Sequence, residues 1–124
     1  MPYPLAGRRV LVAEDLYLIA VTLSESLARA GAEVLGPFPT CADCLATIKK
    51  QHFDAAVLDI ALTDGSVFPV ARELVHEGIP FLFVSGYGPD KLPREFADAP
   101  FLLKPGTEDE ICKQVVALLK VPPT

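Results

Sequence analysis

The sequence has few of the features that direct a chain to secretion or into a membrane. It contains three cysteines, an odd number with no regular framework of spacings, which disfavours a disulfide scaffold and indicates a reducing compartment. The first residues, MPYPLAGRRV, contain no apolar segment typical of a signal peptide. The longest apolar runs, such as IPFLFV, are far shorter than a membrane span. We therefore expect a cytoplasmic protein.

Clusters of basic residues are also missing. There are 11 Lys and Arg against 16 Asp and Glu, a net charge of -5, and the bases occur singly or in pairs such as Arg8-Arg9. Such a field repels a phosphate backbone, so nucleic acid is not expected as a direct partner. Low-complexity segments and internal repeats are absent as well, which excludes a disordered chain and a solenoid.

The 124 residues that remain to be explained have the composition of one ordinary globular domain, with 51% hydrophobic and 22% charged residues. Apolar runs typical of strands alternate with helical patterns along the whole chain. The five predicted strands are RRVLVAED, AEVLGPF, FDAAVLDIAL, IPFLFVS and PFLLK. Their apolar character predicts a buried parallel sheet with helical crossovers on both faces.

The predicted helices begin and end at recognisable signals. The first has one apolar face and ends at Gly31; the residues of that face are Leu16, Ile19, Ala20, Leu23 and Leu27. Thr40 is the expected N-cap of a second helix over 41–51, with Asp43 in the capping-box position.

The later helices are predicted in the same way. A third covers 66–78, with Pro69 in its first turn and Gly78 at its end. Thr107 and Glu110 form a capping box for a last helix that runs to Leu118. The prolines between 86 and 99 permit only a short helix, which would begin near Pro93.

Polar residues follow four of the predicted strands. They are Glu14, Asp15, Asp59, Ser85 and Lys104. In parallel sheets the ligand site lies beyond the carboxyl ends of the strands, so these side chains should meet in one crevice. Two carboxylates about 4 Å apart repel by roughly 4 kcal/mol at an effective dielectric near 20, which calls for a compensating cation.

Mg²⁺ suits this set, because it binds one or two carboxylates and completes its shell with water and phosphate oxygens. Asp59 could then act as a nucleophile toward a phosphoryl group. Ser85 could donate a hydrogen bond to the transferred phosphoryl oxygens, and Lys104 could supply a positive charge.

Four segments, VAED, VLDIAL, FVSGYG and LLKP, in this order and spacing resemble the receiver domain of two-component response regulators. The resemblance covers nearly the whole chain and implies a flavodoxin-like (βα)5 doubly wound sheet with strand order 2-1-3-4-5. It implies that Asp59 is the phosphoacceptor and that Mg²⁺ is held by Asp15, Asp59 and the backbone carbonyl of Ala61, with Glu14 acting mostly through water. The phosphoryl donor would be a histidine kinase or a histidine phosphotransfer protein.

The resemblance also implies switch residues. Ser85 and Phe101 take these roles, and a cis peptide bond is expected between Lys104 and Pro105. The chain departs from the family at Gly106, where receivers usually carry an aromatic residue.

Tyr87, in the sequence SGYG, is a second aromatic residue close to the switch. It is more readily explained as a packing residue. Together with the prolines that follow, GYG is similar to a subset of stand-alone receivers, so the usual output surface at the fourth helix need not apply here.

We therefore expect one receiver domain over 1–124, with a core of about 8–120 and no output domain. Its output would be altered protein contacts, or removal of phosphoryl groups from a shared kinase as a phosphate sink. Beyond phosphorylation and dephosphorylation of itself it should not be an enzyme. The oligomeric state stays open, a homodimer among the alternatives.

Two alternative functions concern the same residues, and a third concerns the cysteine pair. A haloacid-dehalogenase-like phosphatase also uses an aspartate, a Ser or Thr, a Lys and Mg²⁺, but it carries an acid two residues after the nucleophile, where this chain has Ala61. A pseudo-receiver would only bind partners. A redox role for Cys41 and Cys44 is disfavoured because Asp43 opposes a thiolate.

Simpler interpretations exist for the remaining candidates. Glu14 and Asp15 could be an acidic N-cap, worth under about 1 kcal/mol. A zinc site is not expected, because Cys112, His52 and His76 lack ligand spacing.

Overall fold

The computed structural model describes residues 3–104 and 107–120, with backbone only for Lys91, Glu108 and Lys120. The strands are β1 (Arg9–Ala13), β2 (Glu33–Phe38), β3 (Ala55–Asp59), β4 (Ala61–Leu62), β5 (Gly65–Ser66), β6 (Phe81–Ser85) and β7 (Phe101–Leu103). The helices are α1 (Tyr17–Arg29), α2 (Cys41–Lys50), α3 (Phe68–Glu77) and α4 (Glu108–Lys120), with two 3₁₀ turns, η1 (Pro89–Lys91) and η2 (Arg94–Phe96).

Five of the strands form a parallel sheet in the order β2-β1-β3-β6-β7. β6 and β7 are the fourth and fifth strands of this sheet along the chain, so the predicted order 2-1-3-4-5 is confirmed. In the register, Val12 lies opposite Val57 and Val57 opposite Leu82. The fold is the flavodoxin-like α/β fold.

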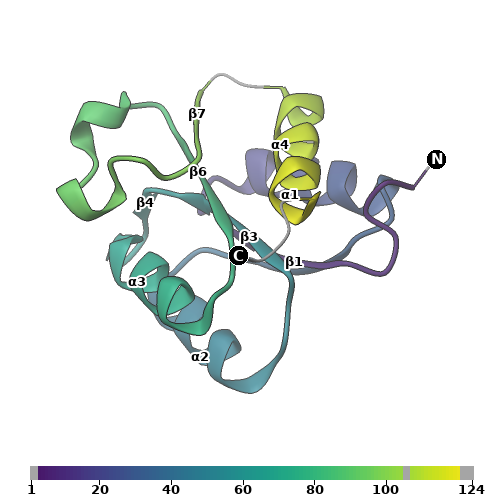
Figure 1. Cartoon of the computed structure of the whole chain (residues 1–124), viewed down its shortest axis with the longest axis horizontal. Coiled ribbons are helices and arrows are strands. Elements are labelled where there is room, and N and C mark those ends of the chain that lie inside the picture. The colour runs from purple at the N-terminus through teal and green to yellow at the C-terminus, as the bar shows by residue number, and fades with distance from the viewer. Residues whose placement is uncertain (1–2, 105–106, 121–124) are drawn as a thin grey trace.

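Helices cover both faces of the sheet (Figure 1): α1 and α4 lie on one face, and α2 and α3 on the other. Alternate residues of each strand feed the two cores, because successive side chains of a strand point to opposite faces. In β1, Val10 and Val12 pack toward α1 and α4, whereas Leu11 and Ala13 pack toward α2 and α3. The continuous apolar character of the central strands follows from this double burial.

The predicted helix signals at Thr40, Gly78 and Thr107 are confirmed. Thr40 Oγ1 accepts a hydrogen bond from Asp43 N at 3.1 Å, and Gly78 ends α3 at φ 73°, a backbone conformation that favours glycine. Thr107 and Glu110 form the reciprocal capping box, with Glu110 N donating to Thr107 Oγ1 at 3.1 Å and Thr107 N to Glu110 Oε1 at 3.3 Å.

The buried face of α1 begins later along the chain than predicted. Leu16 and Ile19 were expected on its buried face, but they are 53% and 41% exposed. Leu16 is the N-cap residue and Ile19 lies in the first turn, while burial begins at Ala20. The first turn of α1 is therefore not buried against the sheet. Periodicity alone could not show where this burial begins.

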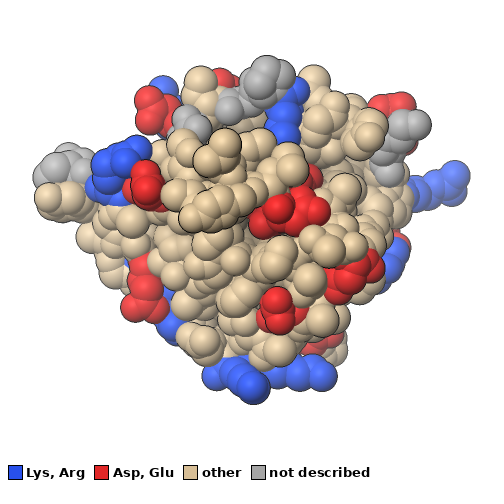
Figure 2. Space-filling view, turned by 180° about the vertical axis from the view of Figure 1, so that it is seen from behind, with Lys and Arg blue, Asp and Glu red and all other residues tan. Residues whose placement is uncertain are grey.

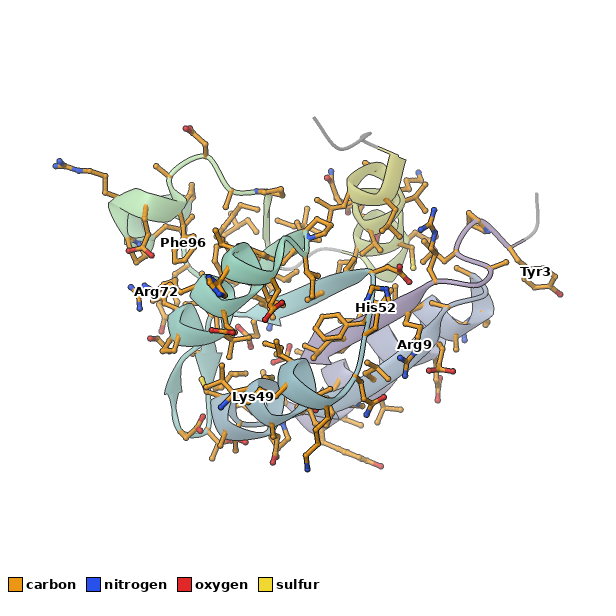
Figure 3. The ribbon with its side chains drawn as sticks, turned by 60° about the horizontal axis from the view of Figure 1, so that its bottom comes forward. Tyr3, Arg9, Lys49, His52, Arg72 and Phe96 are labelled. Atoms are coloured by element: carbon orange, nitrogen blue, oxygen red, sulfur yellow. The ribbon has the colours of Figure 1, made fainter. Side chains whose placement is uncertain are left out.

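Residues 86–99 take the place of a fourth crossover helix. The predicted short helix near Pro93 is the 3₁₀ turn η2, which is fixed to α3 (Figure 3) by Arg72. The Arg72 guanidinium lies 6.0 Å from the centre of the Phe96 ring, and Arg72 Nε donates to Glu95 Oε1 at 2.8 Å. Phe96 is itself buried against Phe83, with ring centres 5.4 Å apart. One end of this segment is thus part of the core.

Charged groups are distributed unevenly over the face shown in Figure 2. Acidic side chains lie both near its middle and along its outline, whereas lysine and arginine lie mainly along its outline. Among the described residues, the helices are too short or too polar to cross a bilayer.

Candidate metal and phosphoacceptor site

The end of β1 delivers two acidic residues in succession. The backbone N of Glu14 donates to the carbonyl of Phe38 at 3.0 Å, so pairing with β2 continues one residue past the strand. Glu14 is buried, at 4% exposure, while Asp15 is exposed. Neither side chain caps α1, whose N-cap is Leu16 without a side-chain hydrogen bond. The simpler interpretation of these acids as an N-cap is therefore wrong.

A third carboxylate reaches the same place from the end of β3. Asp59 is 9% exposed, and the nearest carboxylate oxygens of Glu14, Asp15 and Asp59 all lie within 4.8 Å of one another. The predicted convergence of these side chains from two strand ends is thus observed. Hard oxygen ligands at this spacing suit a cation of the Mg²⁺ or Ca²⁺ type.

Lys104 brings a positive charge into the cluster from the end of β7. Its Nζ lies 2.8 Å from Glu14 Oε1 and 3.2 Å from Asp59 Oδ2. Its backbone N donates to the carbonyl of Ser85 at 2.7 Å, which fixes the β7 end to the β6 end. One lysine is therefore shared between two carboxylates, in line with the need for a cation inferred from the sequence.

The surroundings raise the pKa of Glu14 and that of Lys104 for different reasons. Burial raises the pKa of Glu14 to about 7, with a further contribution from the neighbouring Asp59 and only partial relief from Lys104. Burial by itself lowers the pKa of Lys104, but the hydrogen bond to Glu14 and the charges of Asp59 and Glu14 outweigh it, so that pKa lies above its usual value. A single lysine does not neutralise the site.

Glu14→Gln should therefore stabilise the metal-free protein at alkaline pH. The carboxyl ionises near pH 4.5 when unfolded and near pH 7 when folded, so its ionisation opposes folding progressively between these values. Relative to the native chain, the variant should gain nothing below pH 4.5 and about 1–2 kcal/mol at pH 8, after allowance for solvent screening. Urea unfolding in EDTA across this pH range measures the difference.

The matched control for this variant is Glu25→Gln, at an exposed position of α1. It should show no change of the free energy of unfolding with pH beyond that of the native chain. A Glu14→Gln protein that is less stable than the native chain at pH 8 would show that the bond from Lys104 to Glu14 outweighs the burial of the carboxylate.

The predicted switch residues lie at the end of β6, just after β6 and at the start of β7. Ser85 is 2% exposed, and its Oγ accepts a hydrogen bond from Tyr87 N at 3.0 Å. Phe101 is half-buried and packs against the core on the α2 and α3 side. Tyr87 is 64% exposed, so its interpretation as a packing residue is wrong. The expected cis bond from Lys104 to Pro105 and the departure at Gly106 lie outside the described residues.

Sequence reasoning missed two residues beside the site, Thr63 and Asp64. Ala61 begins the hairpin of β4 and β5, which directly follows Asp59 and which the sequence did not predict. At the tip of this hairpin, Thr63 Oγ1 donates to Asp15 Oδ2 at 3.4 Å, and Asp64 accepts two backbone bonds from α2. The letters TDG indicated only a turn, since Thr and Asp side chains commonly bond to backbone groups close to them in the chain.

The cysteine pair belongs to the core. Cys41 and Cys44 are both buried. Burial raises the pKa of Cys41 to about 11, and burial raises that of Cys44 to about 12, with Cys41 and Asp43 adding to it. Both thiols are protonated at neutral pH, which opposes a redox role.

The residues present fit a divalent cation on two counts. Carboxylate oxygens of Glu14, Asp15 and Asp59 lie within 4.8 Å of one another, and among the described residues Glu14 Oε2 is buried without a hydrogen-bond partner. Such an orphaned acceptor is unusual in a folded protein and fits a site that gains a cation or its bound water.

Comparison with solved structures extends these observations. SdrG from Sphingomonas melonis Fr1 is 37% identical at a TM-score of 0.78, over 94% of this chain and 98% of that one; SdrG in a BeF3-activated conformation also matches, at 0.76. The response regulator PhyR from Brucella abortus is 28% identical at a TM-score of 0.78, over 90% of this chain and 47% of that one. This chain therefore spans about half of PhyR.

A more distant structure shares the fold. It is the response regulator protein TrrA from Thermotoga maritima in complex with Mg²⁺-BeF, 23% identical at a TM-score of 0.78, over 90% of this chain and 99% of that one. No family model and no curated protein matches the chain. With five parallel strands, an acidic cluster at their carboxyl ends, and a 37% identical relative matched over nearly its full length, the chain belongs to the receiver domains of response regulators.

Proposed function

We propose that the chain accepts a phosphoryl group on Asp59 in a Mg²⁺-dependent reaction, with a phosphohistidine of a histidine kinase or phosphotransfer protein as donor. The observation that carries this is the cluster of three carboxylates, Glu14, Asp15 and Asp59, with Lys104 Nζ 3.2 Å from Asp59 Oδ2. The Mg²⁺-BeF complex of TrrA and the BeF3-activated conformation of SdrG support it by analogy.

The chemistry is a transfer between two nucleophiles. A carboxylate oxygen of Asp59 attacks the phosphorus, the new O–P bond forms as the N–P bond of the phosphohistidine breaks, and the histidine keeps the electron pair. Mg²⁺ bound by Asp15, Asp59 and the Ala61 carbonyl, with Glu14 acting through water, would offset the charge that collects between these carboxylates and the phosphoryl oxygens. The protein supplies position and charge rather than a further reactive group.

Lys104 and Ser85 would contact the transferred group. Lys104 Nζ already contacts Asp59, so it needs only to exchange its carboxylate partners for a phosphoryl oxygen. Ser85 Oγ accepts the Tyr87 N–H with a lone pair, which leaves its own proton able to donate to a phosphoryl oxygen. These contacts couple the charge on Asp59 to β6, β7 and the segment 86–99.

A protein donor fits the surroundings of the site. Large apolar side chains next to the acidic residues and to Lys104 are exposed: Leu16 at 53%, Leu18 at 79% and Leu103 at 52%. A donor that brings a histidine to Asp59 must cover this rim, and apolar contact there would add to its affinity. The output is then either altered protein contacts near 86–99 or removal of phosphoryl groups from a shared kinase.

The direct test uses acetyl phosphate as donor. The native protein should gain the mass of one phosphoryl group in Mg²⁺ and none in EDTA, and it should form a beryllofluoride adduct under the same conditions. Incubation with a generic phosphate ester should give no turnover, since we propose no enzymatic activity beyond self-phosphorylation and self-dephosphorylation. Multiple turnovers on the ester would favour the phosphatase alternative, and a protein that never takes up phosphate would favour a pseudo-receiver.

A further inference from the structure

A short hairpin lies between β3, which ends at Asp59, and α3. It consists of β4 and β5, two residues each, paired antiparallel as Ala61 with Ser66 and Leu62 with Gly65. A two-stranded hairpin of this size has little stability of its own. Its position must therefore be set by contacts with the rest of the protein.

Asp64 makes two of these contacts. Its Oδ1 accepts from Cys41 N at 2.7 Å and its Oδ2 from Ala42 N at 3.2 Å, so both oxygens bind the first turn of α2. A carboxylate suits this place because the first N–H groups of a helix lack partners and carry positive partial charge. The Cys41 N–H correspondingly lowers the pKa of Asp64. Cys41 Sγ adds a bond to the carbonyl of Ser66 at 3.0 Å.

The hairpin in turn contacts the acidic cluster. Thr63, next to Asp64, donates from Oγ1 to Asp15 Oδ2 at 3.4 Å, and its backbone N donates to the carbonyl of Pro39 at 3.0 Å. Leu62 is buried, and Ala61 is the second residue after Asp59. Fixing the hairpin therefore also fixes the segment that carries the Ala61 carbonyl and the hydroxyl that bonds to Asp15.

We propose that Asp64 is a positioning residue for the metal and phosphoacceptor site, because it joins the 61–66 hairpin to α2 and so holds the Ala61 carbonyl and Thr63 Oγ1 relative to Asp15 and Asp59. This inference rests on the proposed function. It assigns to Asp64 a role through other residues rather than contact with the phosphoryl group. Groups that orient metal ligands typically change metal affinity by about 10–100-fold when removed.

A purely structural role for Asp64 can be separated from this one. The same turn of α2 has its own cap, Thr40, whose Oγ1 accepts from Asp43 N at 3.1 Å. Asp64 and Thr40 thus bind successive N–H groups of one helix end, but among the described residues no side-chain bond joins Thr40 to the hairpin. Thr40→Ala therefore weakens the helix end and leaves the hairpin attached.

The experiment compares Mg²⁺ affinity in the native chain, Asp64→Ala, Asp64→Asn and Thr40→Ala. Kd is measured by NMR titration of backbone amides, and thermal unfolding is followed for each variant in EDTA. Asp64→Ala should raise Kd about tenfold, at the low end for groups that orient metal ligands. Asp64→Asn, whose amide oxygen can still accept one N–H, should raise it by a smaller factor. Thr40→Ala should unfold at a lower temperature with Kd within about twofold of native.

Two results would overturn the inference. One is an Asp64→Ala protein with native Mg²⁺ affinity. The other is a Thr40→Ala protein whose affinity falls as much as that of Asp64→Ala, which would reduce Asp64 to a helix cap. A native chain that binds neither Mg²⁺ nor beryllofluoride is a different failure, since it contradicts the proposed function itself.

Discussion

The Asp59→Asn variant should fold normally and incorporate no phosphoryl group from acetyl phosphate, at any Mg²⁺ concentration. Asparagine has the shape of aspartate, and its oxygen can still accept a hydrogen bond from Lys104, which bonds Asp59 Oδ2 at 3.2 Å. It lacks the charged nucleophile, so the O–P bond cannot form. Intact-mass measurement after incubation gives the result directly, since the native chain should be labelled and the variant not at all.

The matched control is Asp98→Asn, which removes one negative charge at an exposed position of the segment 86–99. It should be labelled at the native rate. A Mg²⁺-dependent adduct that persists in Asp59→Asn would place the phosphoryl group on another residue of the cluster, and the assignment of Asp59 would then be wrong.

The sequence was informative about the fold because several independent signals agreed on it. Each central strand is apolar on both faces, which only a sheet covered on both sides explains, and the structure has that arrangement. Helix boundaries followed from local chemistry at Thr40, Gly78 and Thr107, where a single side chain or backbone angle decides the outcome. Such signals need no knowledge of distant contacts.

The parts that sequence reasoning missed depend on distant contacts. Leu16 and Ile19 fit the helical period, yet they are exposed. The period does not say how far the sheet extends, so it could not predict their exposure. The tip of the 61–66 hairpin is fixed by α2, some twenty residues earlier in the chain, and TDG indicates only a turn. Tyr87 is exposed while its backbone bonds to Ser85, a division between side chain and backbone that composition cannot show.

The residues of the acidic cluster could be predicted from the sequence, but the way in which their charges are compensated could not. Convergence of Glu14, Asp15 and Asp59 follows from the topology, since the carboxyl ends of parallel strands share one edge. The sequence did not show that Lys104 would bond both Glu14 and Asp59, or that one Glu14 oxygen would be buried without a partner among the described residues. These details give Lys104 a direct part in the charge balance of the metal-free site.

The Lys104→Met variant should be phosphorylated more slowly than the native chain, and it should also be less stable. The loss of stability should depend on pH. Removing a preorganised charge from the phosphoryl oxygens should slow labelling by about 10²–10³-fold. In metal-free protein the two carboxylates lose their shared partner, which should lower the free energy of unfolding by about 1–3 kcal/mol at pH 8, allowing for partial exposure of the lysine.

That loss of stability should shrink on acidification. Glu14 has a pKa of about 7 with the lysine in place, and without the lysine it ionises at still higher pH, so protonation of Glu14 removes the repulsion in the folded state. Urea unfolding at pH 5 and pH 8 in EDTA measures this, with Lys113→Met, at an exposed position of α4, as the control. An equal loss of stability at both pH values would mean that Lys104 acts through packing of its side chain rather than its charge. Labelling at the native rate would show that its charge is not used on the phosphoryl group.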